Sequence, residues 1–98
     1  MDFTLHQLRI FQAVARHGSY SRAAEELFIS QPGVSQQIKS LEASVGMPLF
    51  DRIGRRVYLT EAGDTLLTYA DRVLTLLDEA EGLLRDLGDL NRGTVKVA

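Results

Sequence analysis

Residues 30–46 read SQPGVSQQIKSLEASVG. Ser30 is a residue type that caps helix amino termini, and Pro32 falls in the first turn, where the missing N–H of proline costs nothing. Gly46 favours the left-handed conformation that commonly ends helices. The stretch therefore predicts a helix from Gln31 to Val45.

This helix has two unlike faces. At about 100° per residue, its apolar residues fall within about 40° of one another and predict a core face: Val34, Ile38, Leu41 and Val45. The opposite face is polar and carries no acid: Pro32, Ser35, Gln36, Lys39, Ser40 and Ala43. Gln36 suits a bidentate contact to adenine, and Lys39 suits a phosphate. The alternative is an ordinary solvated helix surface.

Two helices are expected before this stretch. The first carries Leu5, Leu8, Phe11 and Val14 at helical spacing and closes at Gly18. The second begins after Ser19, a good N-cap, and presents small apolar residues that allow close packing. With the turn at residues 28–30, the second and third helices have the helix-turn-helix arrangement.

A hairpin is expected after the third helix. Residues 50–53 and 56–59 are two short β-prone runs, and the two residues between them, Gly54 and Arg55, suit a type II′ turn. Together with Arg52 and Arg56, this wing carries three arginines, which suit phosphate or a minor groove. The alternative is that they serve solubility or surface ion pairs.

One long helix is expected from residue 61 to residue 90, with Thr60 as N-cap and Glu61 in the first turn. Its apolar residues repeat at alternating steps of four and three, the heptad rhythm of a packing seam: Leu66, Ala70, Val73, Leu77, Ala80, Leu84 and Leu87. Two further apolar rows widen this surface. A helix of thirty residues spans about 45 Å. Because a 60-residue domain is too small to bury this much apolar surface, we expect a partner that covers the rest. Residues 93–98 look like the opening of a strand.

Composition narrows the class of protein. The 98 residues, 45% hydrophobic, hold one small domain and one extra element. The net charge of −2 hides an asymmetry, because residues 1–60 carry +2 and residues 61–98 carry −4. Without cysteine, disulfides, thiolate nucleophiles and the usual zinc sites are excluded. With neither a signal peptide nor a membrane span in the sequence, we expect a cytoplasmic protein.

Other classes of function are less well supported. No catalytic, metal or cofactor motif appears, and the two histidines, His6 and His17, are expected to be surface or capping residues, so we expect no enzyme. A membrane-surface role for residues 61–90 conflicts with their acidic charge. An interaction or structural protein, whose long helix does the work, stays open and would show no salt-sensitive binding to duplex DNA.

Several separated pieces together resemble a known family. They are AAEEL at 23–27, SQPGVSQQI at 30–38, Leu41 with Glu42, Gly46, Leu49 with Phe50, the arginines of the wing, and LTEAG at 59–63. In order and spacing they are similar to the amino-terminal domain of LysR-type transcriptional regulators, over about residues 4–90. Two departures are Gly33, where the family usually has alanine, and Val45, where leucine is common.

The resemblance implies a mainly α fold: a winged helix-turn-helix over 1–60, with three helices and a two-stranded wing, then a linker helix over 61–90 that pairs antiparallel with its twin in a homodimer. Residues 91–98 would start a truncated effector-binding domain. Base-reading positions fall on Gln31, Pro32, Ser35 and Gln36. Backbone and wing positions fall on Ser19, Ser21, Lys39, Arg52, Arg55 and Arg56.

The resemblance also implies the partners. The expected function is sequence-specific binding of double-stranded DNA at a dyad-symmetric promoter site in a bacterial cytoplasm, with the recognition helix in the major groove. No cofactor is expected in this fragment, whereas the full-length protein would bind a small-molecule effector. A tetramer in the full-length protein and contact with RNA polymerase are left open.

Overall fold

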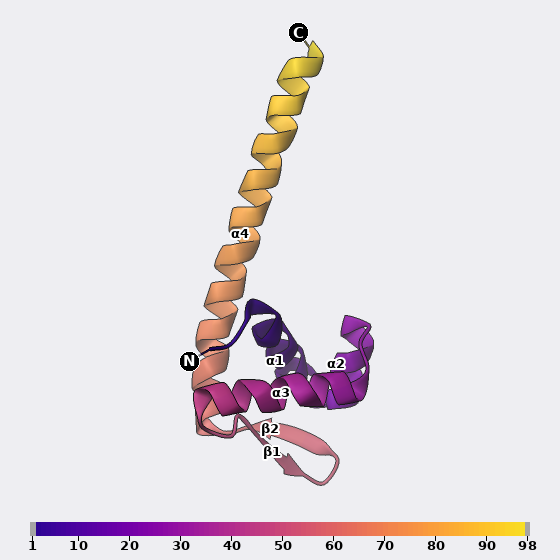
Figure 1. The fold of residues 1–98 in the computed structure, drawn as a ribbon, viewed down its shortest axis with the longest axis vertical. Coiled ribbons are helices and arrows are strands. Elements are labelled where there is room, and N and C mark those ends of the chain that lie inside the picture. Colours follow the sequence, from indigo (N-terminus) through magenta and orange to yellow (C-terminus); the bar gives the residue numbers. More distant parts are fainter. Residues whose placement is uncertain (1, 98) are drawn as a thin grey trace.

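A head of three helices and a hairpin carries one long helix that projects away from it (Figure 1). The computed structural model describes residues 2–97, and the side chains of residues 2–90. The elements are α1 (Leu5–His17), α2 (Tyr20–Leu27), α3 (Gln31–Val45), β1 (Phe50–Ile53), β2 (Arg56–Leu59) and α4 (Glu61–Val97). The predicted winged helix-turn-helix with a long carboxy-terminal helix is confirmed.

Local capping chemistry sets the helix boundaries. Ser19 and Ser30 each accept a hydrogen bond from a backbone N–H in the first turn of the helix that follows, at 3.2 and 3.0 Å. Gly18 and Gly46 end α1 and α3 in the left-handed conformation, with φ of 63° and 84°. The predicted bounds of α3 are therefore confirmed residue for residue. At the start of α1, Thr4 and Gln7 form a capping box.

The head helices share one apolar core. Its fully buried members include Ile10, Phe11, Val14, Ala23, Val34, Ile38, Leu41 and Leu49. Of the core face predicted for α3, Val34, Ile38 and Leu41 are fully buried, and Val45 is half-buried at the edge. This burial fixes which side of α3 faces outward.

The hairpin is tied to the helices by its backbone and its aromatic residues. β1 and β2 pair antiparallel with Ile53 opposite Arg56, so two residues form the turn. Gly54 has φ of 64° and Arg55 does not have a positive φ, as a type II′ turn requires. The amide of Val57 donates to the Gly18 carbonyl at 3.1 Å. The Phe50 ring packs against the rings of Phe11 and Tyr20, with centroids 5.2 and 6.2 Å apart.

The start of α4 is locked to the loop that follows α3. Thr60 caps α4 by accepting from the Gly63 amide at 3.0 Å, and its hydroxyl donates to the Pro48 carbonyl at 2.7 Å. The Thr60 amide donates to the Leu49 carbonyl at 3.0 Å. Gly63 is buried so close to this carbonyl that a Cβ there would overlap the oxygen. Only glycine lets the two backbones approach this closely.

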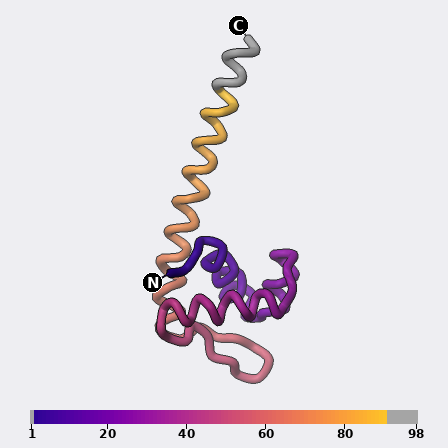
Figure 2. Tube along the Cα trace, viewed as in Figure 1, coloured from indigo at the N-terminus to yellow at the C-terminus, as the bar shows by residue number. Residues whose placement is uncertain are grey.

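One side of α4 packs against α1 (Figure 2). Ala70 and Leu74 are buried in the core of the head. Two polar contacts flank them, from Arg9 to Asp78 at 2.9 Å and from Gln12 to Asp71 at 2.7 Å. This packing decides the rotation of α4 about its own axis.

The rotation corrects one part of the predicted seam. Ala70 is 1% exposed and belongs to the chain's own core, so it is unable to meet a partner. Leu66 and Leu77 are half-buried, whereas Val73, Ala80, Leu84 and Leu87 are exposed. The exposed row with heptad spacing, which we call the outer stripe, comprises Tyr69, Val73, Leu76, Ala80, Leu83, Leu87 and Leu90. It lies about 60° around the helix from the predicted row.

The carboxy-terminal end of α4 also differs from the prediction. The helix was expected to end near residue 90, with residues 93–98 opening a strand, but it continues to Val97. A strand needs a neighbour to satisfy its backbone hydrogen bonds, whereas a helix satisfies them internally. The side chains of residues 91–98 lie outside the described part of the chain.

Replacing Gly63 by alanine tests the junction between α4 and the loop. Gly63→Ala is expected to lower the free energy of unfolding by about 1–3 kcal/mol, because the new methyl group would push the Leu49 carbonyl away. Equilibrium unfolding in urea measures the change. The matched control is Gly82→Ala, where a Cβ meets open space. Because only helix propensity changes there, this variant should gain stability, by at most about 1 kcal/mol. Equal stability of the two variants would contradict the close approach.

Candidate nucleic-acid interface

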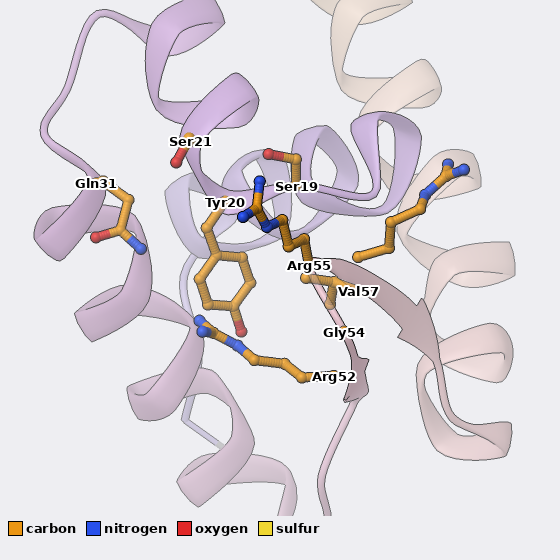
Figure 3. A pocket seen from close by; sticks show the side chains of 9 residues that line it. Ser19, Tyr20, Ser21, Gln31, Arg52, Gly54, Arg55 and Val57 are labelled. Atoms are coloured by element: carbon orange, nitrogen blue, oxygen red, sulfur yellow. The ribbon is translucent and has the colours of Figure 1, made fainter.

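A small cavity, which we call the arginine cavity, lies where the first turns of α2 and α3 meet the hairpin (Figure 3). It has a volume of about 130 Å³ and is lined by Ser19, Tyr20, Ser21, Gln31, Arg52, Gly54, Arg55, Arg56 and Val57. Figure 3 shows Gln31 entering from α3, and Arg52 and Arg55 from the hairpin. Six of the ten residues predicted to contact DNA are therefore brought together: Ser19, Ser21, Gln31, Arg52, Arg55 and Arg56.

The cavity is suited to an anion. Three arginines line it, and no acidic residue does. The amino termini of α2 and α3 add the partial positive charge of their helix dipoles, and helix amino termini with free N–H groups are common phosphate sites. A phosphate of a nucleic-acid backbone fits this chemistry.

A second cavity of about 390 Å³ adjoins the first and extends the surface along α3. It is lined by Tyr20, Ser35, Lys39, Glu42, Phe50 and Arg52. Tyr20 and Arg52 line both cavities, so Ser35 and Lys39 are joined to the arginine cavity. Its one acid, Glu42, is engaged by the Leu49 amide, which donates to the carboxylate at 2.7 Å.

The remaining two predicted residues lie on α3 outside the cavities. Pro32 and Gln36 are exposed, as are Lys39 and Ser40 on the same helix. The neighbouring Gln37 is half-buried and accepts a hydrogen bond from the Gln7 side chain at 3.1 Å. The structure thus leaves Gln36 free to reach outward, while Gln37 is held against α1.

Tyr20 is a part of this surface that the sequence analysis missed. The Arg52 guanidinium carbon lies 4.5 Å from the Tyr20 ring centroid, a cation–π contact that holds the arginine beside the cavity. Burial raises the pKa of Tyr20, and the negative charge of Glu42 adds to this, while Arg52 acts in the opposite direction. The sequence signal that could have identified Tyr20 is its position between Ser19 and Ser21, two predicted DNA contacts at the start of α2.

The other arginines of the wing are held more loosely. The Arg56 guanidinium carbon lies 6.0 Å from the ring centroid of Tyr58. Arg55 is exposed at the tip of the turn. The wing therefore offers one positioned cation, Arg52, and two that are freer to adapt to a ligand.

The part of the chain that the structure describes holds neither a metal-binding cluster nor a membrane-spanning helix. No group of three acidic, histidine or cysteine side chains there could hold a metal ion. No helix there is long and apolar enough to cross a bilayer. His17 lies in a surface cluster, with Nε2 2.7 Å from a Glu26 carboxylate oxygen and Arg16 on the other oxygen at 2.5 Å. His6 is exposed.

Sequence comparison places the chain among bacterial regulators. The family described as "Bacterial regulatory helix-turn-helix protein, lysR family" matches residues 5–64. The HTH-type transcriptional activator CmpR of Synechocystis sp. is 46% identical over 95 residues, which cover 97% of this chain. The RuBisCO operon transcriptional regulator of Allochromatium vinosum is 48% identical over 98 residues. The chain spans about a third of their length, 31% and 32%.

Solved structures agree with the sequence comparison. The BenM_DBD/catB site 1 DNA complex matches with a TM-score of 0.84 and 34% identity, covering 88% of this chain and 96% of that one. The CbnR_DBD-DNA complex matches with a TM-score of 0.80 and 36% identity, covering 88% and 99%. Both matches extend beyond residues 1–60 and include much of α4.

The half-buried Tyr20 side chain predicts a fall in stability at alkaline pH. Because its pKa is raised above the ordinary value of 10.0, its contribution is fully present below pH 10.0 and is lost as the pH rises through the raised pKa. Tyr20→Phe should therefore lose less stability than the wild type between about pH 9 and about pH 11. Urea midpoints at the two pH values measure this. Identical losses in the two proteins would contradict it.

Proposed function

The chain belongs to the lysR family of bacterial regulatory helix-turn-helix proteins, and on that premise we propose that it is the DNA-binding part of a LysR-type transcriptional regulator. It binds double-stranded DNA sequence-specifically, with α3 in the major groove and the wing on the backbone or minor groove. The chain spans about a third of its relatives, so the activity of a whole regulator is part of the proposal.

The observation that carries this proposal is the arginine cavity between two helix amino termini, beside an acid-free outer face of α3. Such a cavity can hold a phosphate and so fix the position of α3 on the duplex. The solved neighbours that the fold matches over 88% of the chain include complexes with DNA. The positive charge of residues 1–60 also favours this end of the molecule for DNA.

The proposed contacts divide by chemistry. Base edges are read by Gln31, Pro32, Ser35 and Gln36, and phosphates are held by Ser19, Ser21, Lys39, Arg52, Arg55 and Arg56. Gln36 has the amide that reads adenine bidentately and is exposed at the centre of the face. Arg52 is positioned on Tyr20 and so suits a fixed phosphate contact.

We further propose that α4 forms a homodimer. The outer stripe exposes seven apolar residues in heptad order, and Leu76, Leu83 and Leu90 are each about two-thirds exposed, at 64–66%. Contiguous apolar surface of this kind marks an interaction site. A second copy carries the same stripe, so a self-complementary pairing covers both. Two heads related by a dyad would then meet two half-sites.

The rest of the assignment follows the family. We propose a winged helix-turn-helix over 1–60, a linker helix over 61–90, and residues 91–98 leading into a domain that binds a small-molecule effector. The protein would act in the cytoplasm without catalysis. A tetramer of two such dimers and contact with RNA polymerase belong to the full-length regulator in this proposal.

Two substitutions on the proposed interface separate base reading from phosphate binding. Gln36→Ala is expected to change the preference at one base position by about 1–3 kcal/mol, because the bidentate contact is lost. Arg52→Ala is expected to weaken all sequences alike and to reduce the slope of log affinity against log salt by about 1. Selection from a random duplex library and titrations at two salt concentrations measure these effects.

The control for both is Arg85→Ala, an exposed arginine on α4 outside the proposed interface. It should leave the selected motif and the salt slope unchanged. An unchanged motif for Gln36→Ala argues against base reading. If the wild-type protein shows no salt-sensitive binding to any duplex, the interaction-protein alternative is favoured instead.

A charge in the outer stripe tests the homodimer. Leu83→Asp is expected to give monomers, because two carboxylates would be buried in the seam. Arg85→Asp, two residues away and outside the stripe, is the matched control and should stay dimeric. Sedimentation velocity measures both. A dimeric Leu83→Asp variant would place the interface elsewhere.

A further inference from the structure

The corner between α1 and α2, residues 18–21 with the sequence GSYS, lies against the hairpin. Ser19 and Ser21 line the arginine cavity and are proposed phosphate contacts. The Gly18 carbonyl accepts a hydrogen bond from the Val57 amide at 3.1 Å, which joins the backbone of the corner to the second strand of the hairpin. The same short segment therefore offers two hydroxyls to the cavity and holds the wing in place.

Tyr20 lies between the two serines of this corner and contacts the wing through its ring. The ring packs against Phe50 at an angle of 77°, with centroids 6.2 Å apart, and Phe50 packs in turn on Phe11 in the core of the head. Figure 3 shows the Arg52 side chain reaching across to the same ring, and its guanidinium carbon lies 4.5 Å from the ring centroid. The core therefore sets the place of the ring on which Arg52 rests.

The other two arginines of the hairpin are held less closely. The Arg56 guanidinium carbon lies 6.0 Å from the Tyr58 ring centroid, at the limit of a cation–π contact. Arg55 is exposed at the tip of the turn. An arginine that moves freely before binding loses side-chain entropy when it contacts a ligand, whereas one that is already oriented loses less. Arg52 is therefore the arginine of the wing that is best prepared for a fixed contact.

We propose that Tyr20 is a positioning residue for DNA binding: its ring orients Arg52 toward the phosphate that Ser19 and Ser21 also hold, and Tyr20 itself does not touch the DNA. The inference rests on the proposed function and adds to it how the wing arginine is fixed. Tyr20 is the first residue of α2 and Arg52 lies on β1. The ring therefore makes α2 and the hairpin present their phosphate ligands in one fixed arrangement.

A double-mutant cycle separates this positioning role from a general structural role. Tyr20→Leu keeps an apolar side chain beside Phe50 but removes the ring face, and it is expected to lower the affinity for duplex DNA about threefold to tenfold, because Arg52 then has to be ordered on binding. In the Arg52→Ala background the same substitution should change the affinity by less than about twofold. Titrations of the four proteins at one salt concentration measure this. An equal loss in both backgrounds overturns the proposal.

The conservative variant Tyr20→Phe separates positioning from direct contact. Phenylalanine keeps the ring face and lacks the hydroxyl, so this variant should bind duplex DNA within about twofold of the wild type. A loss as large as that of Tyr20→Leu would mean that the hydroxyl itself contacts the DNA, and it overturns the proposal. The matched control is Tyr58→Leu, which removes a tyrosine ring from the same hairpin beside the loosely held Arg56 and should bind like the wild type.

A measurement on the wild-type chain keeps the test independent of whether Tyr20→Leu folds. Nitrogen-15 relaxation of the arginine Nε–H groups, recorded without DNA, reports how ordered each side chain is. Arg52 is expected to be clearly more ordered than Arg55, because only Arg52 rests on the Tyr20 ring. Equal mobility of the two side chains overturns the proposal.

The outcomes separate this inference from the proposed function. A wild-type chain that shows no salt-sensitive binding to any duplex overturns both. Equal losses for Tyr20→Leu in the two backgrounds, or a mobile Arg52 in a wild-type chain that binds duplex DNA, overturn the positioning role alone and leave the DNA-binding function in place.

Discussion

The backbone of Leu49 is the point on which the arrangement of the molecule depends. Its amide donates to the Glu42 carboxylate at the end of α3, and its carbonyl accepts from the Thr60 amide before α4. Gly63 packs directly against the same carbonyl. One residue thus joins α3, the start of the hairpin and α4. A buried backbone group that is hydrogen-bonded on both sides is costly to disturb, so the angle between the head and α4 is set here.

The wing depends on a second set of contacts, which are aromatic. Phe50 packs between Phe11 and Tyr20, and Tyr20 in turn carries the guanidinium of Arg52. The Val57 amide adds a hydrogen bond to the Gly18 carbonyl. The position of Arg52 relative to α3 is therefore decided by the core. This pre-organisation would lower the entropic cost of the proposed phosphate contact.

Much of the fold could be predicted because local chemistry marks it. Ser19, Ser30 and Thr60 are caps, Gly18 and Gly46 end helices, and Gly54 defines the turn, so the boundaries follow from residue type. Six of the nine residues that line the arginine cavity were predicted to contact DNA, but their convergence on one cavity needed the three-dimensional structure. Tyr20 was missed because an aromatic residue at a helix start has no motif of its own; its role arises from Arg52, thirty-two residues further along the chain.

The sequence predicted that α4 carries an apolar row with heptad spacing, but it placed this row at the wrong rotation about the helix axis. The reason again lies in contacts that only the three-dimensional structure shows. Three apolar rows share the same heptad rhythm, so periodicity alone is unable to say which row faces the head. Ala70 was taken as a seam residue because of its place in one row. Its small side chain instead lets α1 approach, and Leu74 follows it into the core. The end of the helix was missed because the alternation of Val95 and Val97 suits a strand only when a neighbouring strand is present.

The heptad order of the outer stripe restricts how the length of α4 can change in evolution. An insertion or deletion of one residue between Gly63 and Leu76 would turn the distal leucines by about 100° relative to the head. A change of seven residues keeps them nearly in phase. In an antiparallel pair it would move the two heads apart by about 10 Å, or about three base pairs of B-DNA. Relatives that read half-sites at different spacings would then differ in linker length by whole heptads. Substitutions that leave the length of α4 unchanged are not restricted in this way.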